Sequence, residues 1–136
     1  MADVKALMRR FYNEVVNAHN LDAVDDMVSA NFVEHEVFPG LPNDASAVKA
    51  FFGMMFEAFP DLRIEATDLI AEGDKVVSRC TMSGTHKGTF MDIPATGKRF
   101  EIAAIDIIRF EGEKAAEHWG VTDQMAMMQQ LGVVPK

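Results

Sequence analysis

Near residue 62 the hydrophobic pattern of the chain changes its period from about 3.6 residues to about 2. Before that point, apolar residues recur at helical spacing over residues 4–18, with Asp3 as a plausible N-cap, and a broad Phe-rich face runs from Asp44 to Phe59. After it, apolar and polar residues alternate in two hairpins that turn at "EGDK" and "EGEK". Helices followed by antiparallel strands are typical of an α+β domain, not of a wound α/β sheet.

Shorter elements lie between and after these segments. "NLDAVDDMV" predicts a short helix, "NFVEHEVF" a strand, and "QMAMMQQLG" a closing helix that Thr122 or Asp123 caps and Gly132 ends. We expect one domain over residues 1–136, in which two helices cover one face of four antiparallel strands. A strongly curved sheet wrapped over a helix leaves an opening at one end, where a small molecule can enter.

Composition and charge exclude several classes of function. Thirteen basic and 21 acidic residues give a net charge of −8, and no basic cluster is present, so nucleic acid is not an expected partner. The single cysteine, Cys80, cannot form an internal disulfide. The N-terminus lacks an apolar signal core and no run of eighteen apolar residues exists, so we expect a cytoplasmic protein without a membrane partner. Ten Phe and ten Met suit an adaptable apolar cavity.

The stretch "EHWGVTD" places several polar groups around the only tryptophan. On a strand, Glu117 and Trp119 share one face and His118 lies on the other. Asp123 follows at the mouth, where the strand passes into the last helix. Two interpretations stay open for Asp123: a helix cap, or a carboxylate in an apolar cavity whose raised pKa suits proton transfer.

Three further polar residues are candidates on separate segments. His35 lies between Val33 and Val37 on one face of a strand, which is typical of a hydrogen-bonded core residue and also fits a catalyst. His86 ends a strand where a flexible loop begins, a position that suits either a binding residue or an exposed loop residue. Asp106 faces either solvent or a pocket together with its i±2 neighbours.

Arg109 and Glu117 flank the "EGEK" turn as cross-strand partners, either at the surface or as part of a pocket wall. Other chemistries have no support in the sequence. There is no nucleophile elbow, no glycine-rich loop between a strand and a helix, and no paired metal spacing among the four histidines. We therefore expect neither a metal nor a cofactor.

Five segments together resemble the SnoaL-like polyketide cyclase (ester cyclase) family: "FVEHEVFPG", "AFPDLRIEATDLIAEGDKVVSRCTMSGTHKGTF", "IPATGKRFE", "IDIIRFEGEK" and "AEHWGVTDQMAMMQQLG". The resemblance covers roughly residues 5–132. It implies the nuclear-transport-factor-2-like (cystatin-like) fold, a cone-shaped curved antiparallel sheet wrapped on helices around a deep apolar pocket. It also implies a homodimer paired through sheet faces.

Members of this family close a polyketide ring by intramolecular aldol condensation without a metal or cofactor. Their essential acid/base is the aspartate after the last strand, which matches Asp123. The resemblance thus implies Asp123 as the catalytic base and matches His35, His86 and Trp119 to pocket positions. We expect His35 or His86 to be the catalytic donor to the enolate oxygen. The substrate-binding residues that we expect are Trp119, Glu117, Arg109, Asp106, Phe52 and Phe56. Two departures, "DIPATGK" and "EKAAE", concern the substrate, since Ala115 in the second removes a large aliphatic side chain and enlarges the cavity.

The leading hypothesis is a cofactor-independent acid/base enzyme that acts on a small apolar or aromatic carbonyl compound. Two alternatives remain. A small-molecule binding protein without chemistry would not bring Asp123, His35 and His86 to one cavity. An epoxide hydrolase or isomerase would need two acids at one water or one substrate carbon, with Asp106 as the partner of Asp123.

Overall fold

The computed structural model describes residues 3–133, in which five strands form one sheet in the order β1-β5-β4-β3-β2. The four later strands pair with antiparallel neighbours, whereas β1 pairs with β5 in parallel. A bulge interrupts the register of β2 with β3 and of β4 with β5, which increases local twist. The strands are β1 (Val28–Glu34), β2 (Arg63–Glu72), β3 (Lys75–Thr85), β4 (Arg99–Glu111) and β5 (Lys114–Thr122).

The helices come mainly before the long strands. None of those in the described part of the chain is long and apolar enough to cross a bilayer. Their bounds are α1 (Val4–Phe11), the π-helix η1 (Tyr12–Asn17), the 3₁₀ turn η2 (Leu21–Ala23), α2 (Val24–Met27), α3 (Ser46–Ala58) and α4 (Gln124–Leu131).

The first predicted helix is confirmed, with one change in its second half. The Asp3 side chain caps it by accepting the N–H of Ala6 at 3.2 Å. From Tyr12 the helix widens into π-helical turns, an arrangement that is frequent at functional sites. Tyr12, Val15 and Val16 all point into the core from this segment.

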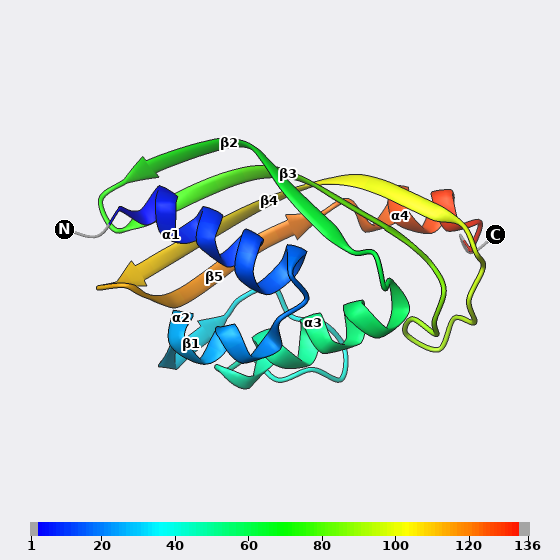
Figure 1. Cartoon of the computed structure of the whole chain (residues 1–136), viewed down its shortest axis with the longest axis horizontal. Coiled ribbons are helices and arrows are strands. Elements are labelled where there is room, and N and C mark those ends of the chain that lie inside the picture. The colour runs from blue at the N-terminus through cyan, green and yellow to red at the C-terminus, as the bar shows by residue number, and fades with distance from the viewer. Residues whose placement is uncertain (1–2, 134–136) are drawn as a thin grey trace.

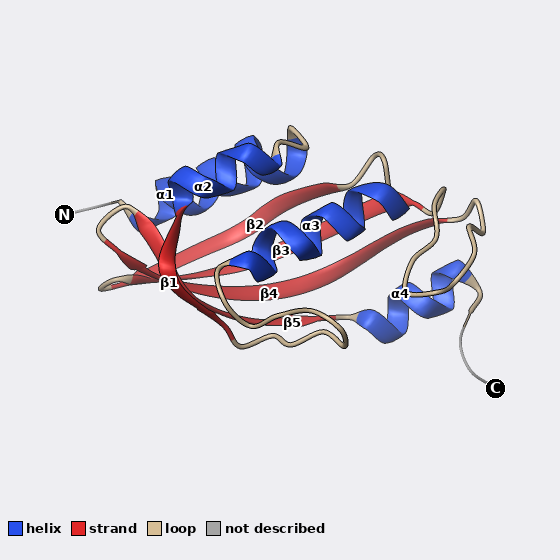
Figure 2. Ribbon diagram, turned by 90° about the horizontal axis from the view of Figure 1, so that it is seen from below, coloured by secondary structure: helices blue, strands red, loops and turns tan. Residues whose placement is uncertain are grey.

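Figures 1 and 2 show α1 and α3 on the same face of the curved sheet, with α4 beyond the end of β5. Inward-facing side chains of β3 and β4 alternate with outward-facing ones, as in the buried Val76, Ser78, Cys80 and Met82. The helices cover this inner face, and the opposite face remains open to solvent. The predicted α+β fold with a curved sheet against helices is therefore confirmed.

The first strand, β1, differs from the expected strand in its bounds. The segment "NFVEHEVF" was expected as a short strand between helices, but β1 begins earlier, at Val28, because α2 is a single turn that ends at Met27. β1 then joins the sheet edge beside β5 in parallel, with Val33 opposite Glu117 and Glu34 opposite His118. This pairing brings the acidic end of β1 next to the inner face of β5.

Candidate active site

A cavity lies between the inner face of the sheet and helices α1 and α3. It encloses about 930 Å³ of space free of protein atoms, its open mouth included. Most of its lining is aliphatic or aromatic, and its polar groups come from β1, β4, β5 and η1. The lining residues are Phe11, Tyr12, Val28, Phe32, Glu34, Glu36, Phe38, Leu41, Pro42, Ala47, Val48, Phe51, Phe52, Ile64, Cys80, Met82, Ala104, Asp106, Ile108, Ala115, His118 and Thr122.

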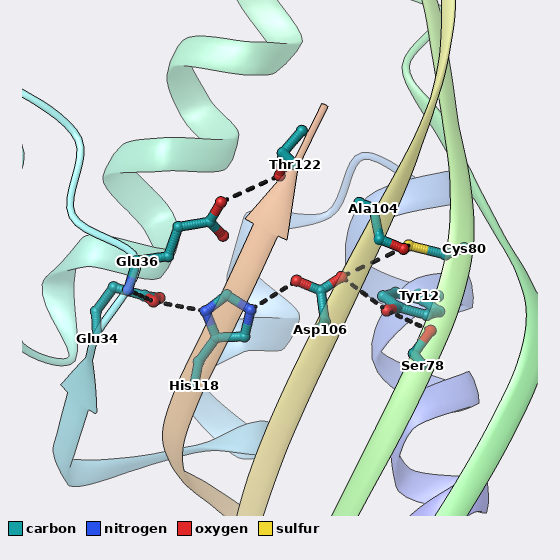
Figure 3. Close-up of polar contacts among 9 residues, drawn as sticks. All are labelled: Tyr12, Glu34, Glu36, Ser78, Cys80, Ala104, Asp106, His118 and Thr122. Atoms are coloured by element: carbon teal, nitrogen blue, oxygen red, sulfur yellow. Dashed lines mark hydrogen bonds and ion pairs between the residues drawn. The ribbon is translucent and has the colours of Figure 1, made fainter. Parts of the chain in front are cut away.

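His118 is held between two carboxylates on the inner face of β5. Its Nε2 lies 2.7 Å from Oδ1 of Asp106 and its Nδ1 lies 2.5 Å from Oε1 of Glu34 (Figure 3). Burial by itself would lower the pKa of His118, but the hydrogen bonds and charges of the two carboxylates outweigh it and raise the pKa to about 10. At neutral pH the side chain is therefore an imidazolium that donates from both nitrogens.

The second oxygen of Asp106 is held by groups from two other elements. The hydroxyl of Tyr12, from η1, donates to Oδ2 at 3.2 Å and also lies 2.9 Å from Oγ of Ser78, while Sγ of Cys80 lies 3.6 Å from Oδ2. Burial and the nearby carboxylate raise the pKa of Tyr12 far above its usual value and that of Cys80 to about 12. Both groups therefore keep their protons at neutral pH and act as donors to Asp106.

Glu36 lies just beyond β1, and its carboxyl group lies near Asp106 and His118. Its Oε2 accepts a hydrogen bond from the hydroxyl of Thr122 at 3.1 Å (Figure 3). Burial raises the pKa of Glu36; the positive charge of His118 opposes this, and the negative charge of Asp106 adds to it. Glu36 is therefore a carboxyl group whose proton affinity is shifted toward neutral pH.

Gly120 allows these carboxylates to come together. It lies directly opposite Asp106 in the β4–β5 ladder and two residues after His118, so its missing side chain would point inward. A Cβ at this position would contact Glu36 Oε1, and it would lie 2.8 Å from Oδ1 of Asp106 and 2.9 Å from Cε1 of His118. The glycine is needed for this close approach.

One atom each of Glu36, Asp106 and His118 lies within 4.8 Å of the others. Within residues 3–133 this is the set of donors close enough to hold a metal ion, with Glu34 behind the imidazole as an outer carboxylate. The absence of a metal stays a prediction of the sequence.

The structure does not bring Asp123 into the cavity. Its side chain is exposed and accepts the N–H of Ala126 at 3.0 Å, which makes it the N-cap of α4. The expectation that this carboxylate is desolvated beside Trp119 is wrong, because β5 ends at Thr122 and the chain turns outward into the helix. The capping interpretation is confirmed, and a catalytic role for Asp123 gains no support from the geometry.

His35, Trp119, Glu117 and Arg109 lie together on the outer face of the sheet, away from the cavity. The rings of His35 and Trp119 stack at 4.8 Å, and Nε2 of His35 lies 2.8 Å from Oε2 of Glu117. Arg109 donates to the other oxygen of Glu117 at 2.7 Å, so the predicted cross-strand pair is confirmed in its surface form. The expected pocket placement of these residues is wrong, because it is the face of β1 opposite to His35 that turns inward.

His86 is fully buried at the other end of the sheet, in neither of the expected loop environments. The N–H of Thr96 donates to its Nδ1 at 3.2 Å, and its ring packs 5.5 Å from that of Phe59. Of the two predicted phenylalanines, Phe52 lines the cavity but Phe56 does not; Phe56 stacks on His19 at 4.2 Å. The three predicted catalytic residues therefore do not converge.

Sequence reasoning missed Glu34, Glu36 and Tyr12, and it placed His118 on the correct strand face without a role. A signal for the two glutamates was present. In "NFVEHEVF" the side chains of Phe32, Glu34 and Glu36 alternate with those of Val33 and His35. The buried residue Phe32 shows which set points inward, whereas Val33 is 40% exposed.

Comparisons with known proteins agree with this fold and cavity. The family model described as SnoaL-like polyketide cyclase matches residues 6–131. The aklanonic acid methyl ester cyclase DauD of Streptomyces sp. (strain C5) is 26% identical over 126 residues, covering 87% of this chain and 77% of DauD. The aklanonic acid methyl ester cyclase DnrD of Streptomyces peucetius is 25% identical over 124 residues, covering 87% and 86%.

The fold is also similar to that of a solved structure. TsrD from Streptomyces laurentii superposes with a TM-score of 0.86 at 30% sequence identity, and the match covers 96% of each chain. Since the family model spans nearly all of the described residues, this chain belongs to the SnoaL-like polyketide cyclase family.

Proposed function

We propose that this protein closes a ring in a small apolar carbonyl compound by an intramolecular aldol reaction, using Glu36, Asp106 and His118. The observation that carries the proposal is the convergence of these three groups, each within 4.8 Å of the others, on the wall of a cavity whose remaining lining is mostly apolar. The two cyclases named above, which act on aklanonic acid methyl ester, support the reaction type.

Glu36 is the candidate general base. A carboxylate that removes a proton from carbon works best when its pKa lies near the operating pH, and burial raises the pKa of Glu36 in that direction. Its Oε1 lies over Gly120, next to Asp106, at the cavity wall. The proton it takes comes from a carbon between two carbonyl groups of the substrate.

His118 is the candidate cation that stabilises the developing oxyanion. Glu34 and Asp106 keep it protonated, and Tyr12 holds Asp106 from behind through Oδ2. Because both N–H groups of His118 already donate to these carboxylates, the imidazolium acts through its positive charge on the carbonyl oxygen under attack. Glu36 gives the proton that it took from carbon to the alkoxide as the new carbon–carbon bond forms, and it ends the cycle as a carboxylate. The product is an isomer of the substrate, so neither an oxidant nor a leaving group is required.

The apolar walls supply the remaining requirement, which is to fold the substrate so that its two reacting carbons meet. Phe11, Phe51 and Phe52 form a connected wall, with ring centroids 5.9 Å apart for Phe11–Phe52 and 5.1 Å apart for Phe51–Phe52. Ala115 contributes a small side chain to the cavity lining, at the position where "EKAAE" led us to expect a larger cavity.

The test is conversion of aklanonic acid methyl ester, followed by chromatography with mass detection, because the cyclised product has an unchanged mass and a new retention time. We expect Glu36→Gln and His118→Gln to reduce turnover by about 10²- to 10⁴-fold. Asp123→Asn serves as the matched control and should retain turnover. Full activity in both cavity variants would contradict the assignment.

Hydrolysis of an epoxide is a second candidate function, supported by one observation. The oxygens of two acids, Glu36 and Asp106, come together over Gly120, and a water molecule held between two carboxyl groups can attack an activated carbon. Incubation of styrene oxide in ¹⁸O-labelled water distinguishes the two functions. Labelled diol that depends on both acids would favour the hydrolase.

We also propose a homodimer that pairs through the outer face of the sheet, as the family resemblance implies. Ile105 and Val121 are directly opposite each other in the β4–β5 ladder and are 47% and 76% exposed. Val33 on the neighbouring β1 is 40% exposed as well. Adjacent exposed apolar residues on a sheet face support burial against a second copy.

A further inference from the structure

The cavity lining carries more acidic groups than basic groups. Glu34, Glu36 and Asp106 are acidic, and His118 is the one basic group; no lysine or arginine lines the cavity in residues 3–133. The imidazolium of His118 is shared between Glu34 and Asp106, at 2.5 and 2.7 Å. One positive charge therefore faces two carboxylates before Glu36 is counted.

Glu36 is the carboxylate of this set to which no cationic side chain in residues 3–133 donates a hydrogen bond. Thr122 donates to its Oε2, but Oε1 accepts no hydrogen bond from the part of the chain that the structure describes. Burial raises the pKa of Glu36, which expresses the cost of holding another negative charge here. A ligand that brings a positive charge would remove this cost, and a ligand carboxylate would increase it.

The remaining lining suits a flat cation. Six aromatic side chains line the cavity, and four of their rings are in a chain of contacts: Phe38 is 4.8 Å from Phe51, Phe51 is 5.1 Å from Phe52, and Phe52 is 5.9 Å from Phe11. Aromatic faces attract cations, more strongly where water is excluded, and they stack on planar frames. Two carboxylates on one side and aromatic rings on the other are the usual surroundings of a protonated amine.

We propose that the natural ligand of this cavity carries a basic nitrogen on a flat apolar frame, with the nitrogen placed between Glu36 and Asp106. The inference rests on the site proposed above and names the class of its substrate: a carbonyl compound that also bears an amine or a basic nitrogen heterocycle. A protonated amine donates to Oε1 of Glu36 and to a carboxylate oxygen of Asp106, while Oε2 of Glu36 stays available to take the proton from carbon. Anionic ligands are rejected by the same charges.

The experiment measures binding by isothermal titration calorimetry at pH 7.5 with three probes on one frame: 2-(aminomethyl)naphthalene, 2-(hydroxymethyl)naphthalene and 2-naphthoate. We expect the amine to bind at least about tenfold more tightly than the alcohol, and the carboxylate most weakly, because a hydrogen bond between two charged groups is stronger than one that a neutral hydroxyl donates. The ranking in the unmodified protein tests the inference even where a variant does not fold. Equal affinities for the three probes would overturn it.

Two variants locate the effect. Glu36→Gln should reduce the preference for the amine over the alcohol at least about fivefold and leave the affinity for the alcohol unchanged. Glu65→Gln makes the same change in net charge at an exposed ion pair with Arg63, and it should alter neither affinity. An equal loss of preference in both variants would show that only overall charge is measured, and would overturn the placement of the nitrogen.

A titration with Mn²⁺ tests the competing cation. If Mn²⁺ binds at micromolar concentration, displaces the amine and loses its affinity in Glu36→Gln, the cluster is a metal site and the inference is overturned. Binding needs no turnover, so the result is separate from the cyclase assay. An amine preference without cyclisation of aklanonic acid methyl ester would leave the ligand class standing, and cyclisation without an amine preference would overturn the ligand class and leave the reaction standing.

Discussion

Nε2 of His118 lies 2.7 Å from Oδ1 of Asp106, on adjacent antiparallel strands. Asp106 and His118 are not directly opposite each other in the ladder: Asp106 pairs with Gly120 and Ile108 pairs with His118. The contact is therefore diagonal, and it spans the inner face only because Gly120 has no side chain. Glu34 holds the other nitrogen from β1, so three strands fix one imidazole.

The charge of His118 makes stability depend on pH. Its folded-state pKa of about 10 lies above the unfolded value of about 6.5, so its contribution is complete below about pH 6.5 and is lost as pH rises toward 10. The raised pKa of Glu36 acts in the same direction. We expect the free energy of unfolding, measured with urea, to fall across this interval. His118→Gln should flatten the curve, and a stability that rises from pH 7 to 10 would contradict the assignment.

Gly120→Ala should disrupt the cluster. The added Cβ would meet carboxylate oxygens of Glu36 and Asp106, so the variant should lose about 1–3 kcal/mol of stability and most of the turnover. The measurement is urea unfolding together with the cyclase assay. Gly53→Ala, within α3, is the matched control: a Cβ there lies 3.7 Å from the Leu21 side chain, an ordinary contact, and the change should stabilise the protein by about 0.5–1 kcal/mol.

Asp123→Asn and Asp106→Asn separate the two aspartates. Asparagine caps a helix about as well as aspartate, so the first variant should keep both stability and turnover. The second loses the charge that holds His118 protonated and should reduce turnover at least about 10²-fold. A histidine side-chain NMR titration should also show a lower pKa for His118 in Asp106→Asn. A large loss of turnover in Asp123→Asn alone would restore the sequence-based assignment.

Val121→Asp tests the proposed dimer, because it places a charge on the exposed apolar pair with Ile105. We expect light scattering after size exclusion to show a dimer for the unmodified protein and a monomer for the variant. Met125→Asp adds the same charge to an exposed apolar residue of α4 and should leave the dimer intact. A monomer in the unmodified protein would refute the pairing.

The expectation that no metal takes part has its own check. Turnover of aklanonic acid methyl ester should be the same before and after dialysis against EDTA, and added Zn²⁺ or Mn²⁺ should not raise it. Loss of activity in EDTA that Mn²⁺ restores would assign the Glu36, Asp106 and His118 cluster to a metal. Activity that is insensitive to EDTA but lost in Glu36→Gln would support proton transfer by the side chain itself.

Local sequence patterns were sufficient for the elements. The change of period near residue 62, the two glycine turns and the caps at Asp3 and Asp123 act over a few residues, so they can be recognised without knowing the rest of the chain. The strand alternation also predicted that His118 points away from Glu117 and Trp119, and this is confirmed. Phe52 and Asp106 were correctly expected at the cavity.

Which strand face turns inward, and which distant groups meet there, depended on packing. Valines on both sides of His35 suggested a core position, yet the parallel pairing of β1 with β5 turned Glu34 and Glu36 inward instead. A shift of one residue along a strand turns every side chain to the opposite face of the sheet. The free energy that decides between the two faces comes from contacts with segments far away in the sequence. The sequence therefore determined the helices, strands and caps, whereas only the tertiary structure decided which acids surround His118.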